Sequence, residues 1–165
     1  MQIRHSPSTI VSGKLATFTT RDQSVEQEHD LLTRIRALND KATFNRWCAI
    51  EVISAELGSA TIAMPWREEA GQYSSFLHAG LVGALIDTAC GFSAVGLVGR
   101  VLASHNAINF LRPAVGSRFI ARGRVVKSGK SQIFTACELY AENGAQEKLV
   151  ATGEALLLVV GEGKA

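Results

Sequence analysis

A single carboxylate stands in the middle of a long uncharged segment. Between Ala79 and Gly99, Asp87 is the only charged side chain. We expect it to be buried in apolar surroundings, where a carboxylate is more basic than in water. When ionised, it could activate a water molecule or attack a carbonyl carbon as a nucleophile, and the sequence does not separate these routes. Thr88 follows directly and could donate a hydrogen bond in the same site.

Further polar groups precede Asp87 at short spacing. His78 lies nine residues before it, and Gln72 lies six residues before His78. If a helix begins near Ala79, the backbone N–H groups of Ala79 and Gly80 lie at its positive end, where a developing oxyanion is stabilised. Gln72 could orient a water molecule or a substrate. For His78, an ordering role in the loop is as plausible as a catalytic one.

The segments around these residues predict an α+β protein. Residues 1–24 are polar and irregular, so the chain divides into an arm with a short helix (1–40) and one domain (41–165). Periodicity predicts a helix at 24–38, a strand pair within 46–66 that turns at 57–59, and strands at 101–111, 117–127, 131–141 and 148–160. The nearly continuous apolar run 79–99 is interpreted as a helix buried in the protein. We therefore expect a curved, mostly antiparallel sheet of five or six strands around the long apolar helix.

Composition narrows the class of protein. The chain has 165 residues, of which 47% are hydrophobic, and its net charge is only +2. Its basic residues are not interleaved with aromatic ones, so nucleic acid is a poor fit. The central Asp and five glycines argue against membrane insertion of segment 79–99. Three widely spaced cysteines show neither disulfide nor zinc spacing, so we expect a cytoplasmic protein without a metal site.

This order of elements resembles the hotdog fold, and the local sequence resembles the PaaI-type acyl-CoA thioesterases. That family carries Asn or Gln, then His-Gly-Gly six residues later, then Asp nine residues after the His. Here the matching positions are Gln72, His78-Ala79-Gly80 and Asp87-Thr88. Segment 108–114 (INFLRPA) and the turn Gly129-Lys130 match later family elements. Two positions depart from the pattern: Ala79 replaces a Gly, and Ala103 stands where the family often has Ser or Thr.

The resemblance implies a hydrolase that splits acyl- or aryl-CoA into free acid and CoA, with Asp87 as base or nucleophile. A backbone N–H at the helix start would polarise the thioester carbonyl. Ala79 and Asp87 are about 12 Å apart along a helix, so one carbonyl cannot meet both in one chain. The site must be shared in a homodimer, alone or within a homotetramer. CoA belongs to the substrate, and its phosphates suit Lys127, Lys130 and Arg112.

Several alternatives stay open at this stage. Asp87 could instead pair with Arg112 in a structural network. The protein could be an acyl-CoA-binding hotdog protein without catalytic activity, or a hotdog dehydratase acting on 3-hydroxyacyl thioesters. Cys90 lies one turn past Asp87 and is expected to be a packing residue. His105 and Asn106 could line the pocket or be structural.

Overall fold

The computed structural model describes residues 20–161, with side chains from Glu28 onward. Six strands form one sheet in the order β1-β2-β4-β5-β6-β3, and all neighbouring strands are antiparallel. The strands are β1 (Glu51–Glu56), β2 (Ser59–Pro65), β3 (Val101–Phe110), β4 (Arg118–Ser128), β5 (Gln132–Asn143) and β6 (Gln146–Val159). The helices are α1 (Thr20–Lys41), α2 (Thr43–Trp47) and α3 (Ala79–Val98), and Glu68–Ala70 forms the 3-10 turn η1.

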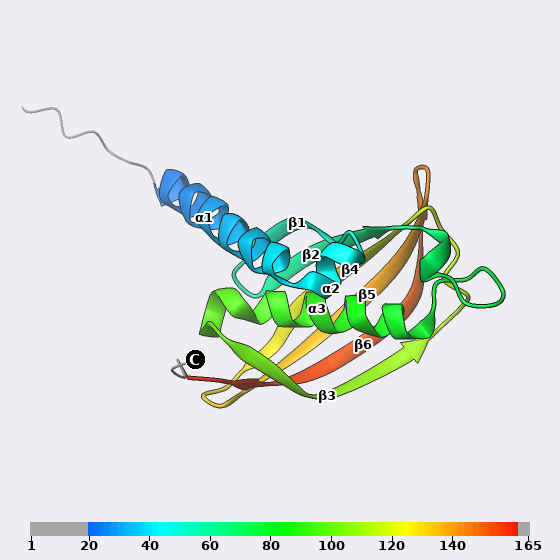
Figure 1. Ribbon diagram of the computed structural model, residues 1–165. Coiled ribbons are helices and arrows are strands. Elements are labelled where there is room, and N and C mark those ends of the chain that lie inside the picture. The colour runs from blue at the N-terminus through cyan, green and yellow to red at the C-terminus, as the bar shows by residue number, and fades with distance from the viewer. Residues whose placement is uncertain (1–19, 162–165) are drawn as a thin grey trace, which may run out of the picture.

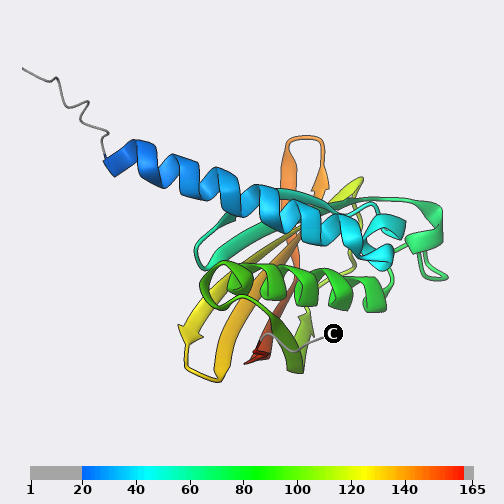
Figure 2. The same cartoon turned by 60° about the vertical axis from the view of Figure 1, so that its left-hand side comes forward.

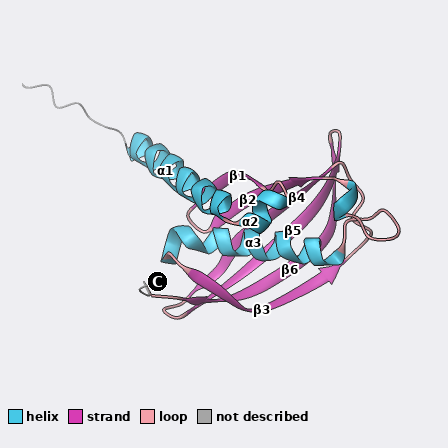
Figure 3. Ribbon diagram, viewed as in Figure 1, coloured by secondary structure: helices cyan, strands magenta, loops and turns pink. Residues whose placement is uncertain are grey.

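The long apolar helix α3 lies along the concave face of the curved sheet and contacts all six strands (Figures 1 and 3). Its buried face consists of Leu81, Val82, Leu85, Ile86, Ala89, Cys90, Ser93 and Ala94. Although α3 has the length and hydropathy of a membrane span, this face makes it the core helix of the fold. The predicted α+β hotdog architecture is confirmed.

Glycines allow α3 to lie close to the sheet. A Cβ at Gly123 in β4 would lie 2.3 Å from the carbonyl oxygen of Ala89, and one at Gly153 in β6 would lie 2.6 Å from Cγ2 of Ile86. Because a methyl group cannot approach a heavy atom so closely, both strands need glycine where the helix crosses them. Gly123 and Gly153 therefore fix the position of α3 against the sheet.

The N-terminal helices differ from the expectation. α1 runs from Thr20 to Lys41, beyond the predicted 24–38, and Leu31 and Ile35 bury it against the core (Figure 2). α2 occupies residues expected to form a break and the start of a strand. Its N-cap Ala42 makes no side-chain cap, and capping is the local signal of a helix start. Residues 1–19 of the predicted arm lie outside the described residues.

The buried amide of Asn45 explains why α2 forms. Its Nδ2 donates to Oδ1 of Asn39 at 3.1 Å, and Nδ2 of Asn39 donates to the carbonyl oxygen of Ile50 at 2.8 Å. These hydrogen bonds join α2 to the end of α1 and to the chain entering β1. They are tertiary contacts, so periodicity and propensity carry no sign of them.

β3 forms one edge of the sheet. It pairs only with β6, whereas β1 at the opposite edge is covered by α1. Two of its large apolar side chains are open to solvent, with Leu102 62% and Phe110 57% exposed. A long strand with a free edge and exposed apolar side chains is a template for pairing with another chain.

Candidate functional site

His78 is the N-cap of α3. Its Nδ1 accepts a hydrogen bond from the Gly80 N–H at 2.9 Å, and its carbonyl oxygen accepts from the N–H groups of Leu81 and Val82 at 2.9 and 3.1 Å. The Ala79 N–H has no acceptor among the described residues. Of the two N–H groups predicted to stabilise an oxyanion, Gly80 is thus already engaged, and Ala79 is available to a ligand.

The Ala79 departure from the family pattern does not strain the backbone. In the described part of the chain, the only non-glycine residues with positive φ are Ala49 and Ser75. His78 has φ −61° and ψ 137°, and Ala79 is the first helical residue. Any L-residue fits a helical conformation at this position, so replacing Gly by Ala retains both the shape of the turn and its backbone donor.

A tight loop carries Gln72 towards the helix start. Gln72 and Phe76 are joined by a backbone hydrogen bond of 2.8 Å, and Oε1 of Gln72 accepts from the Ser74 N–H at 2.7 Å. Gln72, His78 and Ala79 line a cavity of about 400 Å³, here named the Ala79 cavity, together with Tyr73, Phe76, Leu77, Val82, Phe110, Arg112, Pro113, Ala114, Val150 and Ala151. The structure brings these three predicted residues together.

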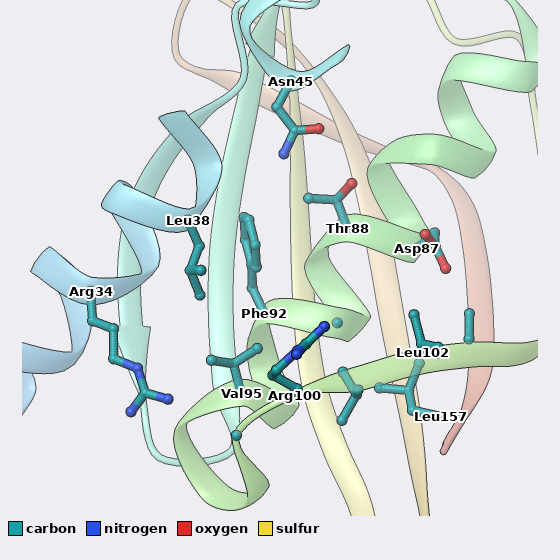
Figure 4. A pocket seen from close by; sticks show the side chains of 14 residues that line it. Arg34, Leu38, Asn45, Asp87, Thr88, Phe92, Val95, Arg100, Leu102 and Leu157 are labelled. Atoms are coloured by element: carbon teal, nitrogen blue, oxygen red, sulfur yellow. The ribbon is translucent and has the colours of Figure 1, made fainter. Parts of the chain in front are cut away.

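Asp87 and Thr88 line a different cavity of about 450 Å³, here named the Asp87 cavity (Figure 4). Asp87 is half-buried, not buried as expected, because it lies outside the buried face of α3, beside the edge strand β3. Its Oδ1 accepts a hydrogen bond from Nδ2 of Asn106 at 3.0 Å. A carboxylate that an amide donor holds at the wall of a cavity can accept a proton from a molecule bound there.

Asn106 is one of two β3 residues, with His105, for which the sequence left a pocket role and a structural role open. A bulge in β3 between Ala103 and His105 leaves Ser104 out of register, and the Ser104 hydroxyl donates to the carbonyl oxygen of Leu156 at 3.0 Å. Such a bulge changes which face the following side chains point to. Strict alternation from Ala103 therefore gives the wrong face for Asn106.

Asp87 and Ala79 do not share a cavity within one chain. Arg112 lines the Ala79 cavity, so the alternative in which it pairs with Asp87 is wrong in this structure. Between residues 28 and 161, the ion pairs are Arg118 with Glu51 and Arg122 with Glu147. Asp87 is thus free of a cationic partner in this part of the chain.

The three predicted phosphate-binding residues are exposed, and they lie in two places. Lys127 and Lys130 are at the β4–β5 turn, whereas the Arg112 N–H bonds to the carbonyl oxygen of Val150 in β6. Lys127 pairs with Phe134 of β5, which in turn pairs with Leu156 of β6. Leu156 and Val150, the β6 residue that Arg112 contacts, are six residues apart, which is about 20 Å along a strand. One phosphate group cannot meet both places in one chain.

The thiol of Cys90 is fully buried and does not reach either cavity. Its neighbour across the core is Cys137, whose pKa is held well above the usual thiol value by the hydrogen bond with Cys90 and by burial. Cys137 therefore stays protonated, and the buried Cys90 beside it is a packing residue, as expected. Among the described residues, no three His, Cys, Asp or Glu side chains gather as metal ligands do.

Comparison with known proteins finds the thioesterase superfamily. The sequence model of that superfamily matches residues 75–148. A crystal structure of a thioesterase family protein from Silicibacter pomeroyi is 30% identical, with a TM-score of 0.76 over 79% of this chain and 99% of that chain. The E. coli PaaI protein, from the phenylacetic acid degradation operon, has the same fold at 23% identity, with a TM-score of 0.75 over 82% of this chain and 96% of its own.

Another relative is a Saccharolobus solfataricus protein whose name proposes an esterase activity. It is 28% identical over 97 residues, which are 58% of this chain and 69% of that protein. The superfamily match and the PaaI-like fold together confirm the predicted resemblance to PaaI-type thioesterases.

Proposed function

Because the chain belongs to the thioesterase superfamily, we propose that it hydrolyses the thioester of an acyl- or aryl-CoA to the free acid and CoA. The observation that carries this proposal is the unengaged Ala79 N–H at the positive end of α3. One such donor aimed at the developing oxyanion contributes about 3 kcal/mol to transition-state stabilisation. The chemistry needs the thioester, a water molecule and the chain's own residues.

The proposed site is shared by two subunits. The Asp87 cavity lies at the start of β3, where Val101, Leu102 and Ala103 line it. The Ala79 cavity lies at the other end, beside Phe110. A two-fold axis that pairs two β3 edges antiparallel sets the start of one strand beside the end of the other. Asp87 of one subunit then approaches Ala79 of the other.

The same pairing would gather the phosphate-binding residues. Lys127 and Lys130 lie at the end of the sheet that holds the start of β3, and Arg112 follows the end of β3. An antiparallel β3 pair brings Arg112 of one subunit towards Lys127 and Lys130 of the other. These three cations would hold the phosphates of CoA at the mouth of the shared site.

The proposed reaction uses the Asp87 carboxylate of one subunit and the Ala79 N–H of the other. The Asp87 carboxylate takes a proton from water, and the hydroxide formed adds to the thioester carbonyl carbon. The carbonyl oxygen becomes an oxyanion that accepts from the Ala79 N–H. Its collapse breaks the C–S bond and expels the CoA thiolate, which takes up the proton. Direct attack by Asp87 would instead form an anhydride that water hydrolyses. Gln72 and Thr88 are placed to orient the thioester and the water.

Thiol release from a panel of short, medium, long-chain and aryl acyl-CoAs tests the proposal. We expect turnover by wild type and a loss of at least about 100-fold in Asp87→Asn, the order seen when a general base is removed. Asp40→Asn, an exposed carboxylate outside both cavities, is the matched control. Both variants are to be compared by size-exclusion chromatography, so that a change in assembly is not mistaken for a change in chemistry.

An acyl-CoA-binding module without catalytic activity is the second candidate. The observation in its favour is Ala103, which lines the Asp87 cavity without the hydroxyl that the family often has there. Acyl-CoA binding without any thiol release would support this module and contradict the hydrolase.

In either case the three free, buried cysteines suit the reducing cytoplasm, where we propose the protein works.

A further inference from the structure

The Asp87 cavity extends beyond the carboxylate, towards the C-terminal end of α3. The walls of this extension are apolar, with Leu38, Phe92, Val95, Leu102 and Leu157 among the lining residues. Arg34 from α1 and Arg100 from the segment after α3 also line it, and Figure 4 shows Val95 between them. α1 is thus a wall of the cavity, although it lies outside residues 75–148 that match the superfamily.

These two guanidinium groups have no carboxylate partner among the described side chains, whose ion pairs are Arg118–Glu51 and Arg122–Glu147. Glu28, Asp30 and Glu56 border a neighbouring hollow with Arg34, but none forms an ion pair with it. Among the described side chains, Asp87 is the only acid that lines the cavity itself. A guanidinium offers a planar fork of donors that matches a carboxylate, so two such groups at an apolar cavity favour an anionic ligand end.

We propose that the acyl group carries a distal carboxylate, which Arg34 and Arg100 bind while its apolar stem lies along Phe92 and Val95. This substrate class rests on the proposed thioesterase function and deepens it. Val95 lies eight residues past Asp87, about 12 Å along the helix. A medium-length dicarboxylic acyl chain spans that distance. A short one would place its carboxylate beside Asp87, where like charges repel.

The experiment compares matched pairs of CoA thioesters that differ only in the terminal group: octanoyl with suberoyl, and decanoyl with sebacoyl. We expect wild type to have the higher kcat/KM on the dicarboxylic member of each pair, and succinyl-CoA to be a poor substrate. Arg34→Gln combined with Arg100→Gln should lower the dicarboxylic preference by roughly tenfold, the order of a partly solvated hydrogen bond between charged groups. Arg124→Gln, on the solvent face of β4, is the control.

Two further measurements test the binding of the distal carboxylate separately from CoA-phosphate binding and from the proposed hydrolysis. The same pairs made as N-acetylcysteamine thioesters lack the nucleotide, so a preference that persists there excludes an effect of the arginines on CoA phosphates. Non-hydrolysable thioether analogues, S-octyl-CoA and its terminal carboxylate counterpart, measure recognition by wild type without turnover. Equal or weaker binding of the carboxylate analogue overturns the inference whether or not the protein hydrolyses thioesters. Absence of thiol release, with tighter binding of that analogue, overturns only the hydrolase.

Discussion

Asn106 holds the one carboxylate on which the proposed chemistry depends. Its amide donates to Oδ1 of Asp87 at 3.0 Å. We predict that Asn106→Ala lowers kcat about tenfold with little change in KM, because a lost hydrogen bond to a charged, half-exposed group costs about 1.5 kcal/mol. Asn106→Asp should be worse than Ala, since it sets a second carboxylate against the first. Steady-state thiol release on the best substrate measures both.

Asn109 provides a matched control on the same strand. Its amide meets Oγ1 of Thr152 at 3.5 Å and does not contact Asp87. Asn109→Ala should leave kcat within about twofold of wild type, as for a surface change away from special contacts. If Asn106→Ala raised KM and left kcat intact, Asn106 would be a binding residue and not a positioning residue for Asp87.

His78 is assigned by its contacts to the helix start. We predict that His78→Ala lowers the free energy of unfolding by about 1 kcal/mol, the cost of losing an N-cap acceptor. His78→Asn retains a capping acceptor, so it should restore both stability and kcat. Urea unfolding and thiol release on the three proteins check this. A stable His78→Asn variant that is as inactive as His78→Ala would mean instead that the imidazole takes part in the reaction.

The contact between α3 and β4 sets the position of Asp87 relative to the sheet. A Cβ at Gly123 would lie 2.3 Å from the Ala89 oxygen, two residues from Asp87. We predict that Gly123→Ala destabilises the protein by about 3 kcal/mol, because backbone must move against backbone. Gly91→Ala is the control: apart from its own stretch of helix, no atom lies within 4 Å of where its Cβ would be, and Ala should stabilise the helix by about 0.5–1 kcal/mol. Equal thermal unfolding of both variants would contradict this seat for α3.

The elements whose residues carry a local pattern were predictable from sequence, whereas those fixed by tertiary contacts were not. The strand runs were foreseen because their apolar residues alternate, and α3 was foreseen because its apolar run is long and nearly continuous. The β5–β6 turn at Asn143-Gly144, where Gly144 has φ 58°, lies between the strands predicted at 131–141 and 148–160. α2 was missed because buried amides hold it. Asn106 stayed undecided because the bulge at Ser104 cannot be read from alternation.

The division of the candidate site between two cavities makes subunit assembly part of the proposed reaction. The motif spacing predicted this division, since Ala79 and Asp87 are too far apart on one helix. The free edge of β3 offers the pairing surface. That Arg34 and Arg100 line the same cavity could not be predicted from the sequence, because α1 comes to lie beside α3 only in the folded protein. A test of the shared site therefore needs two variants that still fold, one without the Ala79 N–H and one without the Asp87 carboxylate.

Ala79→Pro is such a variant. Proline is favoured at the first helical position, and His78 before it already has the extended backbone that a residue before proline needs. The substitution removes the free N–H without disturbing the helix, so we predict a folded protein that has lost most activity. Asp87→Asn removes the carboxylate instead. In the proposed homodimer, either variant on its own then has two defective sites.

Mixing the two variants after unfolding and refolding should restore activity. In a mixed dimer, one site receives Ala79 from the Asp87→Asn chain and Asp87 from the Ala79→Pro chain, and the other site receives both changes. Random assembly makes half of the dimers mixed, so about a quarter of wild-type activity should return. Thiol release from the refolded mixture, set against each variant refolded alone, measures this. A mixture no more active than its components would mean that each site is built within one chain.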